Sequence, residues 1–136
     1  EVMVRWAGWS LLIVLVSGQG PLEKYPPTVH WVNATLDHFA FTREAAQPFP
    51  QKFLVWDKWR AEKSSPIMFY FGNEGAIEDF YNATGLLFEV AQELGALCVF
   101  LEHRYYGESL PFGERSYDTA NLRFLTVEQA LADTAQ

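Results

Sequence analysis

Ile67-Met68-Phe69-Tyr70-Phe71-Gly72 is the stretch that decides the fold class. Its five apolar residues lie between a proline and a glycine, a pattern typical of a short strand buried on both faces of a parallel sheet. Ala96 to Leu101 is a second run of this kind. Between the two, Leu86 to Leu94 carries apolar residues at every fourth position, and Gly95 suits the position after a helix end. Strand, helix and strand in this order predict a βαβ unit in an α/β fold with a mostly parallel sheet and crossover helices.

Three further elements flank this unit. His30 to Phe41 is rich in aromatic and β-branched residues and predicts a strand with a turn near Asp37, and Phe49 to Trp56 predicts a second strand. Near the C-terminus, Thr126 and Gln129 have capping-box spacing, so we expect a helix there with an apolar face, formed by Val127, Ala130 and Leu131. This helix reaches Gln136 without an end signal, and we expect the strand that it should lead to beyond the given sequence.

Composition excludes several classes of protein. The chain has 136 residues, 49% of them hydrophobic, which suits one domain. Its net charge is −7 and no basic cluster occurs, so we expect neither a nucleic-acid partner nor binding to an anionic membrane. The one cysteine, Cys98, gives neither a disulfide framework nor a zinc site. We expect it to be a buried strand residue; the alternative is a disulfide with a cysteine outside this sequence.

The N-terminus has the pattern of a secretory signal. Met3 and Arg5 precede an apolar run from Trp6 to Val16, and small residues follow at Ser17-Gly18. The run is too short to cross a bilayer, so residues 1–18 are interpreted as a signal peptide rather than a transmembrane segment. A buried helix or strand is the alternative. Residues 19–29 are expected to be an extended leader, because they contain Gly20-Pro21 and Pro26-Pro27.

Two sequons support export. Asn33 and Asn82 each begin an Asn-Ala-Thr triplet, the acceptor pattern for N-glycosylation. Together with the signal pattern they predict entry into the secretory pathway.

Two polar segments directly follow the two buried strands. The first is Gly72-Asn73-Glu74-Gly75, and the second begins Glu102-His103-Arg104-Tyr105-Tyr106. Catalytic groups of α/β sheets gather at the carboxyl ends of strands, so the two segments are expected to border one cleft. For the glycine turn, a purely structural tight turn is an equally good interpretation. For His103 and Arg104 we favour a structural role, such as an ion pair of Arg104 with a flanking acid, over general-base catalysis.

No complete catalytic triad can be assembled from these residues. Gly107-Glu108-Ser109 begins like a nucleophile elbow, but Pro111 stands where the second glycine should be, so Ser109 is not interpreted as a nucleophile. No metal site is expected either.

The chain resembles the Pro-X carboxypeptidase and dipeptidyl peptidase II family of serine exopeptidases. The similarity runs from about residue 30 to 133 and is carried by four motifs in order: Leu36-Asp37-His38-Phe39, Phe69 to Gly75, Glu102 to Gly113, and Leu125 to Asp133. The segment from Glu102 to Gly113 is the most specific of them. Phe71 in place of threonine and Ala76 in place of aspartate depart from the family pattern, and both flank the glycine turn. Thr134-Ala135-Gln136 departs as well, since the family usually has an aromatic residue after the aspartate.

The resemblance implies a secreted or lysosomal glycoprotein that cleaves peptides next to proline or alanine near a terminus, through an acyl-enzyme and without a cofactor. It implies that residues 30–136 are the N-terminal portion of an α/β-hydrolase domain, truncated before the nucleophile elbow. The catalytic serine, aspartate and histidine would then lie beyond Gln136. Gly72 to Gly75 would border the oxyanion hole and line the cleft, and Glu102 to Tyr106 would support it. A homodimer of the complete enzyme remains open.

Three points stay open from the sequence alone. The two subfamilies are hard to separate, with a slight lean toward dipeptidyl peptidase II. The 136-residue piece is expected to be inactive and to fold poorly, because its strand 67–71 would have an unpaired apolar edge. A non-catalytic short product that binds peptides, or an esterase-like hydrolase, are the alternatives to a peptidase.

Overall fold

A computed structural model describes residues 4–6, 9–11, 20–40 and 47–136. These residues form a mixed α/β fold. The elements in chain order are β1 (Val4–Trp6), β2 (Trp9–Leu11), α1 (Pro21–Lys24), β3 (Thr28–Thr35), β4 (Pro48–Trp56), β5 (Ile67–Phe71), α2 (Ile77–Ala83), α3 (Leu86–Leu94), β6 (Leu97–Leu101), two 3₁₀ turns (Gly113–Tyr117 and Leu122–Phe124) and α4 (Val127–Asp133). The main strands therefore lie close to the positions predicted from the sequence.

The main sheet has four strands in the order β3-β4-β6-β5. β5 and β6 are parallel, with Phe71 opposite Leu101, whereas β4 pairs antiparallel with both β3 and β6. The expectation of a mostly parallel sheet is therefore wrong for the described residues. A parallel pair needs a crossover connection, and in the described part of the chain α2 and α3 provide one between β5 and β6.

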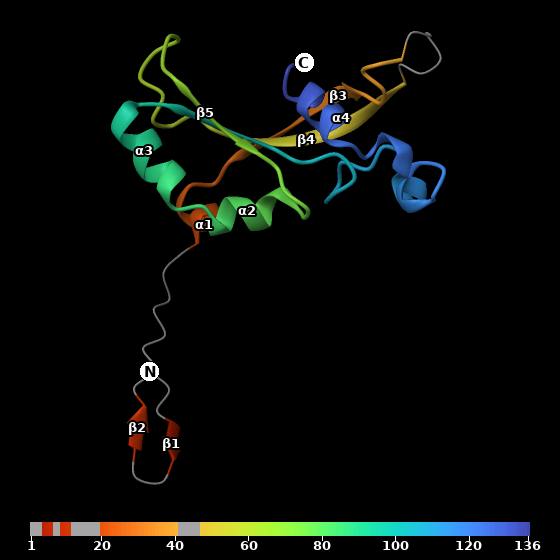
Figure 1. The fold of residues 1–136 in the computed structure, drawn as a ribbon. Coiled ribbons are helices and arrows are strands. Elements are labelled where there is room, and N and C mark those ends of the chain that lie inside the picture. The colour runs from red at the N-terminus through yellow and green to blue at the C-terminus, as the bar shows by residue number, and fades with distance from the viewer. Residues whose placement is uncertain (1–3, 7–8, 12–19, 41–46) are drawn as a thin grey trace.

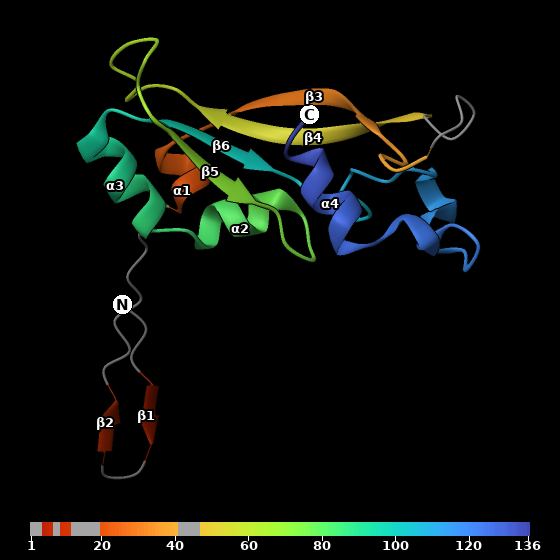
Figure 2. The ribbon, with the colours of Figure 1, turned by 45° about the horizontal axis from the view of Figure 1, so that its top comes forward.

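The predicted βαβ unit is confirmed. α3 ends at Leu94, and Gly95 has the left-handed conformation (φ 61°) that a helix C-terminus favours. α1, α2 and α3 lie together beside the β5–β6 part of the sheet, while α4 lies near β3 and β4 (Figure 1 and Figure 2). The core between the sheet and α2–α3 consists of Leu54, Ile77, Tyr81, Phe88, Ala91, Ala96, Cys98 and Phe100. Cys98 is thus the buried strand residue that the sequence predicted.

One face of β5 is exposed, whereas the sequence predicted a strand buried on both faces. Met68 and Tyr70 pack toward the core, but Ile67 and Phe71 are 60% and 55% exposed. Side chains alternate along a strand, so these exposed residues point to the face opposite α2 and α3. Among the described residues, α4 approaches that face near Phe71. β5 is also an edge strand of the sheet.

α4 begins as predicted but buries a different set of side chains. The Thr126 hydroxyl accepts a hydrogen bond from the backbone N–H of Gln129 (3.3 Å), so the capping interaction is confirmed. The expected apolar face, however, is largely exposed: Val127 and Leu131 are 72% and 58% exposed, whereas Gln129 and Asp133 are buried. The helix is held to the body by polar contacts instead.

The N-terminal predictions are only partly described. Most of the residues assigned to a signal peptide (1–18) lie outside the described residues; those inside form β1 and β2, which pair antiparallel with each other. The segment 19–29, expected to be extended, contains the short helix α1. α1 is tied to α2, because the Asn82 side-chain oxygen accepts a hydrogen bond from the Leu22 N–H (3.0 Å). Among the described residues, no helix has the length and apolar character needed to span a membrane.

Candidate functional site

The two predicted segments lie side by side. Because β5 and β6 are parallel neighbours, their carboxyl ends release the glycine turn and the loop that begins at Glu102 at the same edge of the sheet. Gly72 packs directly on the end of β6: a Cβ there would lie 2.5 Å from the His103 nitrogen and would also overlap the Leu101 carbonyl oxygen. No residue other than glycine fits without moving this backbone.

The glycine turn offers backbone donors. The Gly75 N–H donates to the Asn73 carbonyl oxygen (2.9 Å), and the Asn73 side chain donates to the Tyr70 hydroxyl (3.0 Å). Within the part of the chain that the structure describes, the N–H groups of Asn73 and Glu74 have no acceptor. Both residues are exposed. Two unpaired N–H groups on one tight turn are the type of donor that stabilises an oxyanion.

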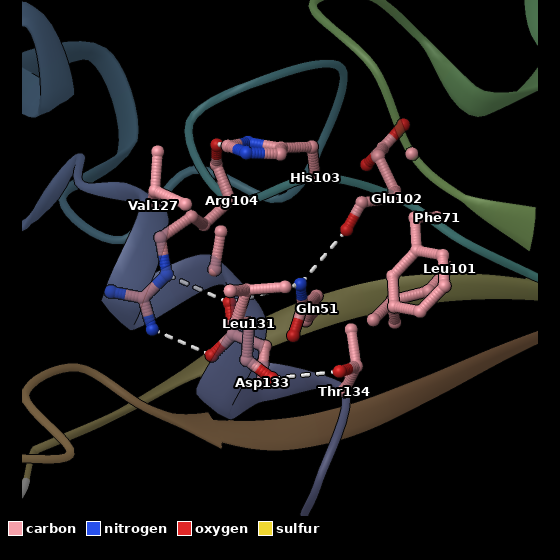
Figure 3. A pocket seen from close by; sticks show the side chains of 12 residues that line it. Gln51, Phe71, Leu101, Glu102, His103, Arg104, Val127, Leu131, Asp133 and Thr134 are labelled. Carbon is pink, nitrogen blue, oxygen red and sulfur yellow. Dashed lines mark hydrogen bonds and ion pairs between the residues drawn. The ribbon is translucent and has the colours of Figure 1, made fainter.

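A cavity of about 200 Å³ lies between the strand ends and α4 (Figure 3). Its wall is mainly apolar, with Phe71 and Leu101 from the sheet facing Val127 and Leu131 from α4. Of the predicted site residues, four line it: Gly72, Glu102, His103 and Arg104. The others, Asn73, Glu74, Gly75, Tyr105 and Tyr106, do not.

Arg104 forms the most extensive polar contacts of the site, and its side chain is fully buried. Its guanidinium donates to both carboxylate oxygens of Asp133, at 2.7 Å from Nε and 2.6 Å from Nη2 (Figure 3). It also donates to the carbonyl oxygens of Thr35, Leu36 and Phe124 (2.9–3.0 Å). The expected ion pair of Arg104 with a flanking acid is therefore wrong. Its partner is on α4, where the geometry allows a bidentate contact.

Asp133 also joins the segment after β3 to α4. Its Oδ1 lies 2.8 Å from His38 Nε2, and one turn earlier Gln129 accepts from the His38 N–H (2.9 Å) and donates to the Asp37 carboxylate (2.6 Å). The motifs around Asp37-His38 and Gln129–Asp133 are thus two halves of one polar contact. Together with Arg104 they fix α4 on the sheet.

Glu102 joins the two predicted segments. Its carboxylate is fully buried; Oε1 accepts from the N–H of Ile77, the first residue of α2, at 3.2 Å. Oε2 accepts from the N–H groups of Glu108 and Ser109 (3.0 and 2.9 Å) and from the Ser109 hydroxyl (2.6 Å). Ser109 is itself buried, which gives it the structural position expected for a serine that is not a nucleophile.

Lys52 lies beneath this carboxylate. Burial alone would lower the pKa of Lys52, but hydrogen bonds to Glu108 (2.7 Å) and Glu78 (3.1 Å) and the charge of Glu102 outweigh it, so the pKa is raised. Lys52 therefore stays charged and supplies positive charge under three carboxylates. Its side chain is 3% exposed.

The remaining loop residues have structural contacts. His103 Nδ1 donates to the Arg104 carbonyl oxygen (2.7 Å), and its ring packs edge-on against Tyr106. Tyr105 is buried with a positive φ of 71°, and its hydroxyl donates to the Asn121 carbonyl oxygen. Burial, assisted by the charge of Glu74, raises the pKa of Tyr106. These contacts favour the structural role predicted for this segment.

Sequence reasoning missed several residues of the site. Gln51 and Lys52 carried no signal of their own, and Asp133 was noted only as the last residue of a motif, because each acts through partners at least 26 positions away in the chain. Gln51 lines the cavity; its Nε2 donates to the Glu102 carbonyl oxygen (2.8 Å), and its Oε1 is buried without a partner among the described residues. The sequons lie elsewhere, and Asn33 and Asn82 are both exposed.

Comparisons with known proteins agree with the motifs. A family model described as Serine carboxypeptidase S28 matches residues 34–136. Lysosomal Pro-X carboxypeptidase from Homo sapiens is 50% identical over 110 residues, which cover 80% of this chain and 22% of the human protein. Prolyl carboxy peptidase like protein 5 from Caenorhabditis elegans is 43% identical over 84% of this chain and 22% of its own length. Thymus-specific serine protease from Mus musculus is 35% identical over 80% and 21%. The chain thus spans about a fifth of the length of these relatives.

Proposed function

This chain belongs to the serine carboxypeptidase S28 family. On that premise we propose that it is the N-terminal part of the catalytic domain of a serine exopeptidase, which releases the C-terminal residue from peptides whose penultimate residue is proline. The relatives named as Pro-X carboxypeptidases support the carboxypeptidase over the dipeptidyl peptidase alternative. The serine, aspartate and histidine would be supplied by chain that follows Gln136.

The observation that carries the proposal is the glycine turn at the end of β5. It lies beside the loop after β6, and its Asn73 and Glu74 N–H groups have no acceptor among the described residues. In α/β-hydrolases one oxyanion donor comes from the loop after the equivalent strand. The β3-β4-β6-β5 order also leaves β5 at the edge. A right-handed crossover from β6 through α4 would place the next parallel strand there, with its carboxyl end near the turn.

In the proposed mechanism a serine attacks the carbonyl carbon of the prolyl residue. The turn N–H groups stabilise the negative oxygen of the tetrahedral intermediate, the C-terminal residue leaves, and water then hydrolyses the acyl-enzyme. The apolar cavity lined by Phe71, Leu101 and Leu131 lies next to the turn. We propose that it is filled by apolar side chains of the following chain rather than by substrate.

We also propose passage through the secretory pathway to a lysosomal or extracellular location, with residues 1–18 removed as a signal peptide. Relatives described as lysosomal and as extracellular support this. Glycans on Asn33 and Asn82 are sterically possible because both side chains are exposed.

The test begins with the transcript. Reading it beyond Gln136 should give a G-x-S-x-G motif, and the complete product should release the C-terminal residue from peptides ending in Pro-X. Substitution of the serine in that motif by alanine should abolish release while secretion continues. A stop codon directly after Gln136, or a complete product that cleaves no Pro-X or dipeptide-releasing substrate, would contradict the proposal and favour a non-catalytic product.

A further inference from the structure

We propose that Glu102 is a positioning residue of the oxyanion site: its buried carboxylate holds the glycine turn in the orientation that presents the Asn73 and Glu74 N–H groups. The inference rests on the proposed function. Glu102 itself would not touch substrate, because its carboxylate oxygens accept hydrogen bonds from within the protein.

The hydrogen bonds of Glu102 connect three separate pieces of chain. Oε1 receives the Ile77 N–H, at the point where the turn passes into α2. Oε2 receives two N–H groups and a hydroxyl from Glu108 and Ser109. The backbone of Glu102 continues β6, where its N–H donates to the Lys52 carbonyl oxygen (2.9 Å). One side chain therefore fixes the exit of the turn relative to both the sheet and the second loop.

Close packing on both sides prevents the carboxylate from moving. Gly107 has a φ of 55°, and a Cβ there would overlap the Glu102 carboxylate. Gly72 packs on the Glu102 backbone, and a Cβ added to Gly72 would lie 3.0 Å from the Glu102 carbonyl carbon. Both glycines are therefore needed because of where Glu102 lies. A shift of the carboxylate would be passed to the turn through the Ile77 hydrogen bond.

Glu102 is not mainly an ion-pair partner of the nearby Lys52. Lys52 Nζ lies 3.4 Å from Glu102 Oε1, but closer to Glu108 (2.7 Å) and Glu78 (3.0 Å). Lys52 is thus mainly paired with the two more exposed carboxylates, and the Glu102 carboxylate is held chiefly by neutral N–H and O–H donors. Glu93 on α3 is exposed, and among the described residues its side chain takes part in no hydrogen bond or ion pair, which makes it the matched control.

The experiment uses the complete protein and compares Glu102→Gln with Glu93→Gln. Glu102→Gln keeps the shape but turns one acceptor oxygen into an N–H₂ group that faces existing donors. We expect kcat to fall about a hundredfold with KM changed by less than about threefold, the size of effect seen when one oxyanion donor is lost. Affinity for a peptidyl boronate, which mimics the tetrahedral intermediate, should fall by a similar factor. Affinity for the product peptide ending in proline should stay the same.

Gly107→Ala is the second variant, since it displaces the carboxylate without removing it. In Glu102→Gln and Gly107→Ala hydrogen exchange should accelerate in the segment 72–80, while Glu93→Gln should match the unchanged protein in every measurement. If Glu102→Gln is secreted too poorly to measure, Gly107→Ala and Glu102→Asp decide the result.

Two results would overturn the inference about Glu102 and still leave the proposed peptidase function intact. Folded Glu102 variants that keep kcat and boronate affinity would show that Glu102 does not position the turn, while the peptidase assignment stands. A uniform loss in which product and boronate affinities fall together would indicate a merely structural residue. If the unchanged complete protein cleaves no Pro-X peptide, the proposed function fails, and the inference fails with it.

Discussion

The contact between Arg104 and Asp133 allows a test of what holds α4 on the sheet. Asp133 accepts four hydrogen bonds, two from Arg104 and one each from His38 and Gln51. Asp133→Asn keeps the size of the side chain but leaves one acceptor oxygen and leaves the Arg104 charge buried without a counter-charge. Breaking a buried pair in this way costs about 3–5 kcal/mol.

The chain also provides a matched control. Arg115 and Asp118 form a second Arg–Asp pair, whose side chains are 80% and 53% exposed. Exposed pairs contribute about 0–1 kcal/mol. Asp118→Asn therefore makes the same chemical change without the burial, and it should leave the local stability of α4 unchanged.

Native-state hydrogen exchange of the segment 127–133 measures this local free energy directly. The exchange rate rises roughly tenfold for each 1.4 kcal/mol of local stability that is lost. In Asp133→Asn the segment should therefore exchange about a hundred to a few thousand times faster. The double variant Arg104→Met/Asp133→Leu should recover part of the loss, since no unpaired charge remains. Equal exchange rates in this segment for Asp133→Asn and Asp118→Asn would refute the stabilising role of the buried pair.

Three further predictions concern single positions. Burial raises the pKa of the Cys98 thiol to about 11 from 9.0, so the contribution of this thiol to stability is complete below about pH 9 and is lost as the pH rises toward 11. A thiol reagent at pH 8 should label Cys98 only in denaturant, and rapid labelling of the native protein would contradict this. Thr126→Ala removes the cap of α4 and should cost about 1 kcal/mol of helix stability, measured by exchange in the segment 127–133. Thr134→Ala, at the half-buried C-terminal end of the helix, should cost less. Asn33→Gln and Asn82→Gln should each reduce the mass of the secreted protein by one glycan, and an unchanged mass would show that sequon to be unused.

Local patterns predicted the elements of this fold well. The apolar runs of β5 and β6, the glycine after α3 and the capping residues of α4 each act through neighbours a few positions away, so the sequence alone reveals them. The adjacency of the two site segments also followed, because a βαβ unit makes β5 and β6 parallel neighbours.

What could not be predicted depends on distant partners. The direction of β4, antiparallel to β6, is set by how the sheet assembles and has no local signal. The partner of Arg104 was misassigned because Asp133, 29 positions away, competes better than the adjacent acids through its bidentate geometry. The exposure of Ile67 and Phe71 depends on which segments cover that face of the sheet, and an apolar run carries no information about that.

A crystal structure of the complete protein with a peptidyl boronate bound to its serine would test the oxyanion role of the glycine turn most directly. We expect a boronate oxygen to lie about 2.7–3.1 Å from the backbone nitrogen of Asn73 or Glu74. A serine-bound boronate whose oxygens contact no N–H group of the turn 72–75 would contradict that role.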